Sequence, residues 1–431
     1  MSRYMHLNLM LGFAGAHEEG WHVDAGGNVT SVNEYYVRMA QLAERGLFDS
    51  VFFASSLSLY MHAGKQPMPV LDPVPLIAYI AACTTHIGLA ATISTTFTEP
   101  YIVAQTMSTL DHLSGGRVGW NIVTSADPSS ARNFGMSVMP PKAERYARAL
   151  EFVEVVEQLW ANWKPGSMYP TKGGAAADPS HIPPIDFHGR YFNVAGPGGV
   201  PATPQGRPIL FQAGASNDGT DFSSRVADGV FCVGLNIEDT RAFCNQLKEK
   251  VALAKRNPDD VKILPGVHLY VGNTDEEAKR IALEEGFQEG LLGLGHLLGI
   301  DARTLDITRP VPDEILEQAM KNPSSQGHTL PAVNAFRRDP TMTVEEYVMQ
   351  HPTSSPHRVL WGSPEKIAAS LEEWFTAGAG DGFTVTNLRV PSLTLFVEHV
   401  VPVLQRKGLF RKEYAGRTLR ENLMQTADGG R

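Results

Sequence analysis

Residues 87–123 read IGLAATISTTFTEPYIVAQTMSTLDHLSGGRVGWNIV, and this stretch decides the fold class. It begins with the apolar run Ile87–Ser94 and ends with the apolar run Val118–Val123. Such near-continuous apolar runs are typical of strands that are buried on both faces of a parallel sheet. A helical stretch follows each run, so the pattern predicts an α/β protein.

The same alternation of short apolar runs and helical stretches continues along the chain. A helix predicted at Ala143–Trp160 carries apolar residues at helical spacing, and one at Asn33–Arg45 ends at Gly46, a residue type that often terminates helices. The apolar runs predict eight strands: His6–Leu11, Asp49–Ala54, Ile87–Ser94, Val118–Val123, Ile209–Ala213, Gly229–Val233, Ile263–Val271 and Gly382–Asn387. Because these strands alternate with helices, we predict a single (β/α)8 TIM barrel domain over residues 1–431.

Two segments interrupt this alternation and are too long for ordinary connections. Residues 165–207 are rich in Gly, Pro and Ala, and residues 291–358 mix a short predicted helix, Asp313–Lys321, with irregular sequence. We expect both to be insertions on the C-terminal face of the barrel, where they would shape a substrate mouth or a lid. The alternative is a surface or oligomer-contact segment. A C-terminal tail follows at residues 401–431.

The composition excludes several classes of protein. The net charge of −9 argues against nucleic acid or an anionic membrane as the main partner. There are three cysteines, Cys83, Cys232 and Cys244, without a CxxC pair, so neither a disulfide framework nor a structural zinc site is expected. The N-terminus lacks the pattern of a signal peptide, and no apolar run reaches the roughly 18 residues of a membrane span. We therefore expect a soluble, cytoplasmic protein.

The polar residues that follow the predicted strands are the candidates for a site, because barrel active sites lie at the C-terminal ends of the strands. Hydroxyl and amide side chains dominate there. They are Ser55, Ser56 and Tyr60 after the second strand, Thr95 and Thr96 after the third, and Asn121, Thr124 and Ser125 at the end of the fourth. Such neutral hydrogen-bonding groups suit a polar, ring-shaped cofactor better than a metal ion.

A turn of small residues after the fifth predicted strand, Gly214–Gly219 (GASNDG), is the best candidate for a phosphate site. Small residues let backbone N–H groups approach an anion, and the following helix presents its N-terminus to it. Arg145 and Tyr146 at the start of a long helix could also meet a phosphate. The alternatives are an ordinary turn, a solvated arginine and a packed tyrosine.

Fingerprints of other nucleotide and metal sites are absent from the sequence. No GxxxxGK[ST] loop occurs, and no GxGxxG follows the first predicted strand, so a Rossmann-type NAD site is not expected. The fourteen histidines form no HExxH motif. His17 and His22 lie in a predicted loop after the first strand. We expect His17 to neighbour a substrate or cofactor, not a metal, with a solvated loop histidine as an equal alternative.

Several stretches resemble one family of enzymes over nearly the whole chain. They are Gly88–Tyr101 (GLAATISTTFTEPY), Ser114–Ser125 (SGGRVGWNIVTS), Phe211–Gly219 (FQAGASNDG) and Val401–Leu423 (VPVLQRKGLFRKEYAGRTLRENL). They resemble the bacterial-luciferase-like flavin monooxygenases, and within these the nitrilotriacetate, EDTA and dibenzothiophene-sulfone monooxygenase group. The closing run is the most diagnostic, because an ordinary C-terminal helix and tail would not reproduce so long a match.

The resemblance implies a two-component monooxygenase. Its TIM barrel would bind FMN in the reduced form, FMNH2, supplied by a separate NAD(P)H:flavin reductase, which accounts for the missing nucleotide fingerprint. Reaction with O2 would give a flavin C4a-(hydro)peroxide that oxygenates a small organic substrate. The protein would position the reactants and exclude water. Relatives are often dimers or tetramers, so the resemblance implies a homodimer or homotetramer.

The resemblance also assigns residues to the flavin site. The implied cofactor-binding residues are Ser55, Thr95, Asn121, Thr124, Ser125, Lys142, Tyr146, Gly214, Ala215 and Ser216. His17 and Tyr60 are the catalytic candidates, and no metal is implied. Two positions depart from the family pattern, since Ser55 stands where relatives commonly have Asp and Lys142 where many have His. Ser55 cannot accept a proton near neutral pH, and Lys142 can meet a phosphate only as a point charge.

These departures leave other hypotheses open. One is an FMN-binding barrel protein that has lost oxygenation, which the loss of a carboxylate at Ser55 suggests. A barrel hydrolase without flavin is another, although it would need paired carboxylates at the strand ends. We expect Phe53, Tyr60, Phe97 and the loop with Trp21 to line the substrate pocket, and this favours a neutral organosulfur, amine or heteroaromatic compound. Five arginines of the second insertion could still face the pocket: Arg303, Arg309, Arg337, Arg338 and Arg358.

Overall fold

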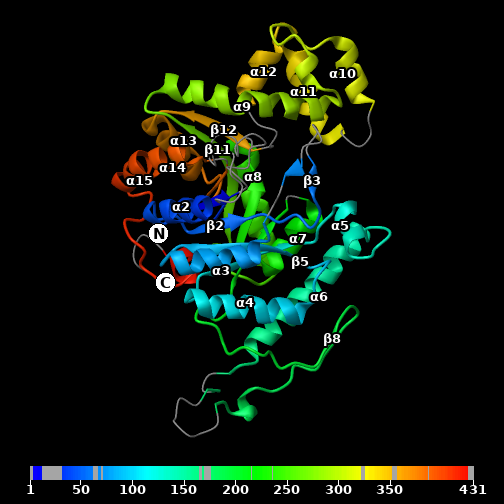
Figure 1. Ribbon diagram of the computed structural model, residues 1–431, viewed down its shortest axis with the longest axis vertical. Helices are drawn as coiled ribbons and strands as arrows, with labels where there is room; N and C mark the ends of the chain where they lie inside the picture. Colours follow the sequence, from blue (N-terminus) through cyan, green and yellow to red (C-terminus); the bar gives the residue numbers. More distant parts are fainter. Residues whose placement is uncertain are drawn as a thin grey trace.

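The computed structural model describes residues 3–11, 32–61, 67–68, 71–164, 167–168, 176–214, 216–234, 236–321, 326–351, 357–386 and 388–425. Eight parallel strands form a closed barrel at its centre (Figure 1). In ring order they are β10 (Gly229–Val233), β9 (Ile209–Ala213), β6 (Val118–Val123), β5 (Gly88–Ser94), β2 (Ser50–Phe53), β1 (His6–Leu11), β13 (Gly382–Thr386) and β11 (Lys262–Val271), which pairs with β10. These are the eight strands that the apolar runs predict, and the (β/α)8 barrel is confirmed.

Helices connect the strands and cover the outside of the barrel, except for the last helix, α16 (Leu419–Leu423), which packs into its N-terminal end. They are α2 (Val32–Arg45), α3 (Pro73–Cys83), α4 (Pro100–Ser114), α5 (Pro128–Asn133), α6 (Lys142–Ala161), α7 (Asn217–Val226), α8 (Ile237–Leu253), α13 (Pro364–Thr376), α14 (Val390–Leu395), the π-helix η6 (Phe396–Val400), α15 (Val401–Arg406) and α16 (Leu419–Leu423). Local signals set their ends. Helix α4, for example, begins with Pro100 in its first turn and stops at Gly115, whose φ of 70° is left-handed.

Alternate strand residues face two different cores. Leu7 and Leu9 of β1 point outward and join the large core between the barrel and its helices. Met10 points inward and packs in a separate cluster with Phe52 and Phe211. This is the period of two that strand geometry imposes. The barrel interior is therefore a packed floor of aromatic and aliphatic side chains, and not a pore.

A ninth strand, β12 (Arg358–Gly362), joins the sheet and was missed in the sequence analysis, which ends the second insertion at Arg358 and predicts no strand after it. It pairs in parallel with Val267–Val271, the second half of the ten-residue strand β11. The first half of β11, Lys262–Gly266, pairs with β10. Strand β12 thus continues the barrel wall beyond the point where the shorter β10 ends.

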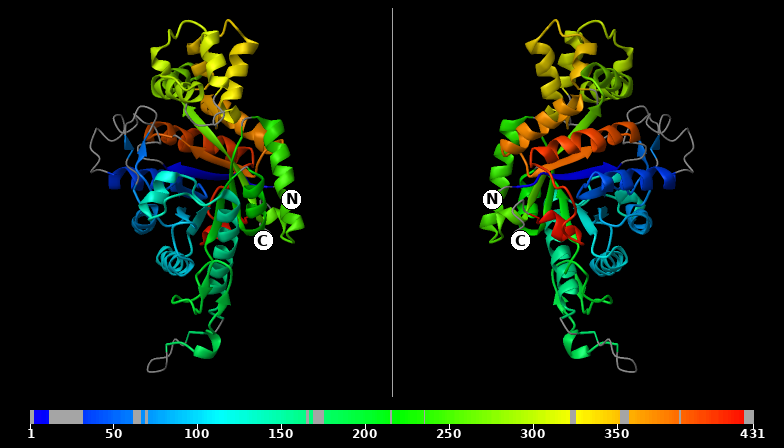
Figure 2. Two further views of the ribbon diagram at one scale, coloured as in Figure 1. Left: turned by 90° about the vertical axis from the view of Figure 1, so that its right-hand side faces the viewer. Right: turned by 90° about the vertical axis from the view of Figure 1, so that its left-hand side faces the viewer.

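The second insertion is more helical than its sequence predicts. It contains the last two turns of α9 (Asp275–Leu298), the 3₁₀ turn η5 (Ala302–Thr304), α10 (Asp313–Met320), α11 (Gln326–Arg338) and α12 (Val344–Gln350). These helices share their own hydrophobic core, formed by side chains such as Leu294, Val333 and Val348. Figures 1 and 2 show them grouped at one end of the molecule, beyond strands β11 and β12. The insertion follows a strand, so it lies on the C-terminal face as expected.

The first insertion differs from the prediction in its position. It joins the end of α6 to the start of β9, so the chain leaves and re-enters the barrel at the N-terminal ends of the strands, opposite to the predicted face. It carries the 3₁₀ turn η3 (Pro179–His181) and a small hairpin of β7 (Phe187–His188) and β8 (Asn193–Val194). Glu151 of α6 accepts hydrogen bonds from the backbone N–H groups of residues 190–192 and holds the hairpin against that helix.

The closing run forms a plug in the N-terminal end of the barrel. Leu419 and Leu423 of α16 insert into the inner cluster beside Phe211. Buried Arg411 contacts the Asp49 carboxylate, and His6 Nδ1 lies 3.0 Å from the same carboxylate. Burial would raise the pKa of Asp49, but the charges of Arg411 and His6 hold it below its usual value. The closing segment Val401–Leu423 thus closes the floor of the barrel.

Candidate active site

A hydrogen-bonded chain of polar groups crosses the C-terminal ends of β2, β5 and β6. Thr92 Oγ1 donates to the backbone oxygen of Phe53 at 2.6 Å, and Asn121 Nδ2 donates to Thr92 Oγ1 at 2.8 Å. Because the Thr92 hydroxyl already uses its proton, it must accept from Asn121, which fixes the orientation of the amide. Asn121 is 4% exposed, and its Oδ1 has no hydrogen-bond partner among the described residues. A buried, oriented acceptor is thus left over inside the barrel.

Other predicted hydroxyl residues lie beside this acceptor. Ser125 Oγ donates to Ser94 Oγ at 2.8 Å, and Ser125 has a φ of 48°, which an L-residue rarely adopts. Thr95 Oγ1 lies 3.3 Å from the backbone oxygen of Val123. Thr96 Oγ1 donates a hydrogen bond to the backbone oxygen of Thr124 at 2.6 Å. The ends of β5 and β6 are therefore tied together by side chains, and their hydroxyls form one polar rim.

Aromatic side chains lie inside the barrel next to these hydroxyls, and they are partly open to solvent. Phe52 packs against Phe211 and Phe231, with ring centroids 6.1 and 6.3 Å away. Toward the C-terminal end of β10 the inward side chains become exposed, since Phe231 is only partly buried and Val233 is 41% exposed. Apolar side chains that face into a barrel and meet solvent are typical of a binding cavity. An aromatic floor thus lies next to the polar rim.

The predicted phosphate turn has the packing that its small residues require. A Cβ on Gly219 would lie 3.2 Å from backbone atoms of Gly214, so the two ends of the turn touch. Ser216 caps α7 and accepts a hydrogen bond from the N–H of Gly219 at 3.3 Å. Ser216 and its neighbours Asn217 and Asp218 are exposed. The helix N-terminus with its partial positive charge is therefore open to an anion.

Two residues at the start of α6 reach this turn. Lys142 Nζ lies 3.0 Å from the Asp218 carboxylate in the first turn of α7, with both side chains about half exposed. The Tyr146 ring packs edge-on against Phe222 of the same helix at 5.8 Å. Lys142 Nζ also lies 5.9 Å from the centre of the Tyr146 ring. The structure thus brings Lys142, Tyr146 and the Ser216 turn together, although they are far apart in sequence.

Two arginines of α6 also contact backbone oxygens at this end of the barrel. Arg145, which the sequence singles out, donates to the backbone oxygen of Thr124 at 3.5 Å, and its buried Nε has no partner among the described residues. Arg148, which the sequence analysis missed, contacts the backbone oxygen of Thr95 and lies over the Phe192 ring at 4.5 Å. Its spacing from Arg145 on one helix face is the signal that could have found it.

Two histidines were also missed in the sequence. His268 is an inward residue of β11 and is 4% exposed. His357 precedes β12, and its ring centre lies 5.9 Å from that of His268 and 5.0 Å from that of Phe231. Burial lowers the pKa of His357 to about 4. A polar residue inside an otherwise apolar predicted strand marks His268, but no local signal marks His357.

Not every predicted residue can be placed. His17 and Ala215 lie outside the described residues, as do Trp21 and His22. The backbone of Tyr60 belongs to a two-residue strand, β3 (Tyr60–Met61), that pairs with β4 (Pro67–Met68). Ser55 is part-buried two residues beyond the end of β2.

The two predicted pocket phenylalanines have different surroundings. Phe53 does not line the pocket, because it points outward into the helix-side core against Tyr36, with ring centroids 5.7 Å apart. The prediction for Phe53 is wrong. Successive side chains of a strand point to opposite faces, and Phe52 is the residue that points inward. Phe97 stacks on Phe134 of the segment after α5 at 4.7 Å.

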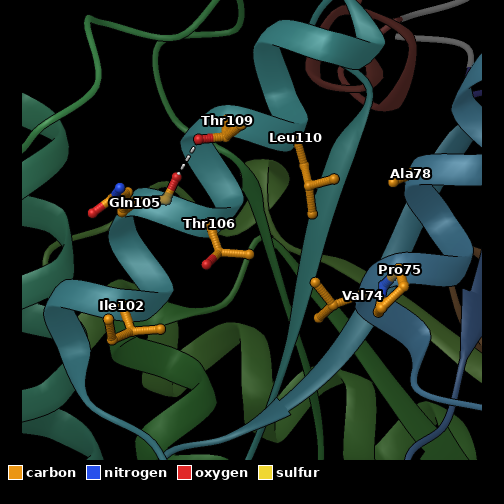
Figure 3. A pocket seen from close by; sticks show the side chains of 8 residues that line it. All are labelled: Val74, Pro75, Ala78, Ile102, Gln105, Thr106, Thr109 and Leu110. Atoms are coloured by element: carbon orange, nitrogen blue, oxygen red, sulfur yellow. Dashed lines mark hydrogen bonds between the residues drawn. The ribbon is translucent and has the colours of Figure 1, made fainter.

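A groove on the outside of the barrel is unrelated to this site. It has a volume of about 370 Å³ and lies between α3 and α4, with Val74, Ala78, Ile102 and Thr109 among its walls (Figure 3). Within the described ranges, no three metal-ligating side chains lie together, and no helix is long and apolar enough to cross a membrane.

Comparisons with known proteins identify the family of the chain. A model of the luciferase-like monooxygenase family matches residues 12–381. The chain belongs to the luciferase-like monooxygenase family. It is 36% identical to nitrilotriacetate monooxygenase component A of Aminobacter aminovorans, a match that covers 98% of this chain and 96% of the relative. It is also 36% identical to dibenzothiophene-sulfone monooxygenase of Rhodococcus erythropolis, over 95% and 93% of the two chains.

Solved structures give the same result. The EDTA monooxygenase of Chelativorans sp. BNC1 superimposes with a TM-score of 0.81 at 30% identity, over 98% of both chains. DmoA from Hyphomicrobium sulfonivorans has a TM-score of 0.84 at 31% identity, over 99% of this chain and 93% of that one. The predicted family and the assignment to the monooxygenases are confirmed.

Proposed function

We propose that this protein is the oxygenase component of a two-component system. It takes reduced FMN from a separate NAD(P)H:flavin reductase and uses O2 to oxygenate a small organic substrate. The observation that carries the proposal is the buried, unpartnered Oδ1 of Asn121 at the open end of the barrel. A flavin ring offers N–H donors to such an acceptor, and an unsatisfied buried acceptor costs about 1–3 kcal/mol until it is met.

The two ends of the candidate site suit the two ends of FMN. Asn121, Thr95 and Ser125 would hold the polar edge of the ring, because they are neutral donors and acceptors with fixed orientations. The exposed Ser216 turn would hold the phosphate with the N-terminus of α7. Lys142 would contribute a positive charge there if it exchanged its Asp218 partner for the phosphate.

When bound, the reduced flavin supplies the activation of O2. The chain's own residues have other tasks. The aromatic floor of Phe52, Phe211 and Phe231 keeps water away from the inner side of the site. Arg148 ties the end of β5 to α6 and so fixes the position of Thr95. Tyr60 and His17 stay our catalytic candidates because they follow the second and the first predicted strand in the sequence.

Flavin binding can be tested with two ligands that differ only in the phosphate. We expect Lys142→Met to weaken FMN about tenfold and to leave riboflavin unchanged, because only FMN carries the anion. Asn121→Ala should weaken both ligands, since both carry the ring. Lys164→Met, at the exposed far end beyond α6, is the matched control. Titration by flavin fluorescence gives the dissociation constants.

Oxygenation is tested by adding a flavin reductase, NADH and O2. The proposal expects an oxygenated product with a suitable organosulfur, amine or heteroaromatic compound. A protein that binds FMN but turns every reducing equivalent into hydrogen peroxide would instead be a flavin-binding barrel without oxygenase activity. A protein that binds neither flavin would contradict the proposal altogether.

We further propose that a second copy of the chain covers the groove between α3 and α4. Helix α3 has no charged residue in its sequence PVPLIAYIAAC, yet Tyr79 is 48% exposed, and the neighbouring Ile102 of α4 is 58% exposed. A helix that is apolar all round is normally buried. Ile102→Glu should shift the protein toward the monomer in sedimentation experiments, whereas Leu253→Glu, an exposed site on α8, should not.

A further inference from the structure

The barrel wall that faces the aromatic floor contains a pair of imidazoles. His268 points inward from β11, at the level where that strand pairs with Thr386 of β13. His357 lies at the start of β12, which continues the wall beyond the end of β10. The two rings are 5.9 Å apart and inclined by 31°. Both therefore border the open end of the barrel, above Phe231.

Gly266 makes room for His357. A Cβ on Gly266 would lie 2.5 Å from Nδ1 of His357 and 2.6 Å from its Cε1, so any side chain there would displace the ring. Gly266 is an inward position of β11, opposite Val233 of β10. The imidazole thus fills the place that an inward side chain of β11 would otherwise take, and it is held between Gly266 and the Phe231 ring.

The imidazole of His357 is a polar group that does not hold other parts of the described structure through its Nδ1 atom. Its Nδ1 is buried and has no hydrogen-bond partner within the described part of the chain. Burial lowers the pKa of His357 to about 4, so the ring is uncharged near neutral pH. An uncharged imidazole can donate one hydrogen bond and accept another, but it offers no positive charge to an anion.

The arginines of the second insertion do not supply that charge either. Arg303 forms a two-point ion pair with Asp301, and Arg309 pairs with Asp306. Arg358 points to the outside of the barrel, where its guanidinium lies 4.9 Å from the Trp374 ring. Arg337 and Arg338 are exposed in the last turn of α11. Three of the five arginines, Arg303, Arg309 and Arg358, thus already contact other side chains of the described structure.

We propose that His357, seated on Gly266 beside His268, is the polar anchor of the substrate cavity and binds an uncharged hydrogen-bonding group of the substrate. A sulfone or sulfoxide oxygen, an aromatic amine or a heteroaromatic nitrogen fits this description, and the attached rings or alkyl groups would lie on the aromatic floor. An uncharged imidazole forms no ion pair with a carboxylate, so this anchor disfavours a polycarboxylate. The inference rests on the proposed function and specifies the substrate class for the same site.

The test compares pairs of compounds with the full-length protein, a flavin reductase and FMN. Each pair consists of a compound that is uncharged near neutral pH, such as a diaryl sulfone, an N,N-dialkylaniline or quinoline, and its carboxylated analogue. We expect the wild type to oxygenate the uncharged member with the lower KM. In His357→Phe, which keeps a ring of similar size against Phe231, KM for that member should rise about tenfold, the effect of one lost hydrogen bond, with little change in kcat.

Three further variants separate binding from folding. His357→Gln keeps a hydrogen-bonding group and should restore part of the affinity. Gly266→Ala leaves the histidine in the chain but displaces its ring, so it should raise KM in the same direction. His399→Phe makes the same change at an exposed position on η6 and should behave as the wild type. The dissociation constant of FMN should be unchanged in all of them.

The outcomes also separate this inference from the proposed function. A wild type that binds no FMN overturns the proposed function. Unchanged FMN binding together with an unchanged KM in His357→Phe overturns the inference alone. It is equally overturned if the wild type binds FMN and prefers the carboxylated compounds, or accepts none of the uncharged ones.

Discussion

Asp111, near the end of α4, has a buried carboxyl whose negative charge lowers the stability of the folded protein. Its side chain is fully buried, and its Oδ1 accepts hydrogen bonds from Gln205 Nε2 and from the N–H of Val118. Its Oδ2 has no partner among the described residues. Burial raises the pKa of this carboxyl, although the hydrogen bonds oppose the shift. The structure thus satisfies one oxygen of the carboxylate and leaves the other without a hydrogen bond from the described residues.

We predict that Asp111→Asn stabilises the protein near neutral pH. The amide keeps the acceptor that Gln205 and Val118 use and removes the buried charge, so a gain of about 1–3 kcal/mol is expected. Because the pKa of Asp111 is raised in the folded state, the free energy of unfolding of the wild type falls as pH rises from the pKa of the unfolded state through that of the folded state. Unfolding midpoints at pH 5 and pH 8 should therefore differ less in the variant. A variant less stable than the wild type at pH 8 would contradict this reading.

Single residues also show where sequence reasoning fails. Phe53 was expected in the pocket and lies in the outer core, because the alternation of a strand cannot tell which of its two faces is the inner one. Asn121 and Ser216 could be proposed from sequence as candidate site residues, because strand ends and turns of small residues are local features. His357 could not, because its position depends on contacts with Gly266 and Phe231, which are distant in sequence.

At the scale of elements, the short helix α16 contributes more to the barrel than its five residues suggest. Thr418 and Glu421 form a capping box at its start, and its backbone is tied to the barrel by the bond from Leu419 N–H to Gly116 O. Leu419 and Leu423 are fully buried in the inner cluster. The helix is too short to be stable alone, so its packing must hold it in place.

We predict that Leu419→Ala destabilises the protein by about 2–5 kcal/mol, the range for removing a buried leucine from a core. The cavity would open between Phe211 and the start of β5, where Leu419 contacts Gly88. Chemical unfolding gives the free energy. Leu253→Ala, at a residue that is 82% exposed, is the control and should change it by about 0.5 kcal/mol or less. Similar effects of the two substitutions would show that α16 does not close the barrel.

At the scale of the whole molecule, one buried charge cluster joins the two ends of the chain. Arg411 from the closing run, His6 from β1 and Asp49 before β2 meet at the N-terminal end of the barrel. Arg411 and Asp49 are each 1% exposed. The barrel cannot close correctly around this carboxylate unless the last segment of the chain brings its counter-ion.

We predict that Arg411→Met costs about 3–5 kcal/mol of stability, because it leaves the Asp49 carboxylate buried without its main partner. The loss should be smaller at acid pH, where Asp49 can take up a proton. Arg280→Met removes an arginine from the exposed pair with Glu284 and should have no measurable effect. Thermal and chemical unfolding of the two variants make the comparison. Equal stability of both would mean that Asp49 is protonated in the folded protein.

The barrel, its eight strands and its family could all be inferred from the amino-acid sequence. Apolar runs of strand length and helices between them are local patterns, and strand ends mark where a barrel site lies. Only the tertiary structure decided which residues meet there: Lys142 with Asp218, and His357 with Gly266 and His268. It also decided that one insertion leaves from the N-terminal end, that Phe52 and not Phe53 faces inward, and that the closing run fills the barrel floor. The reason is physical, since periodicity records which residues are apolar, while a site depends on contacts between segments far apart in the chain.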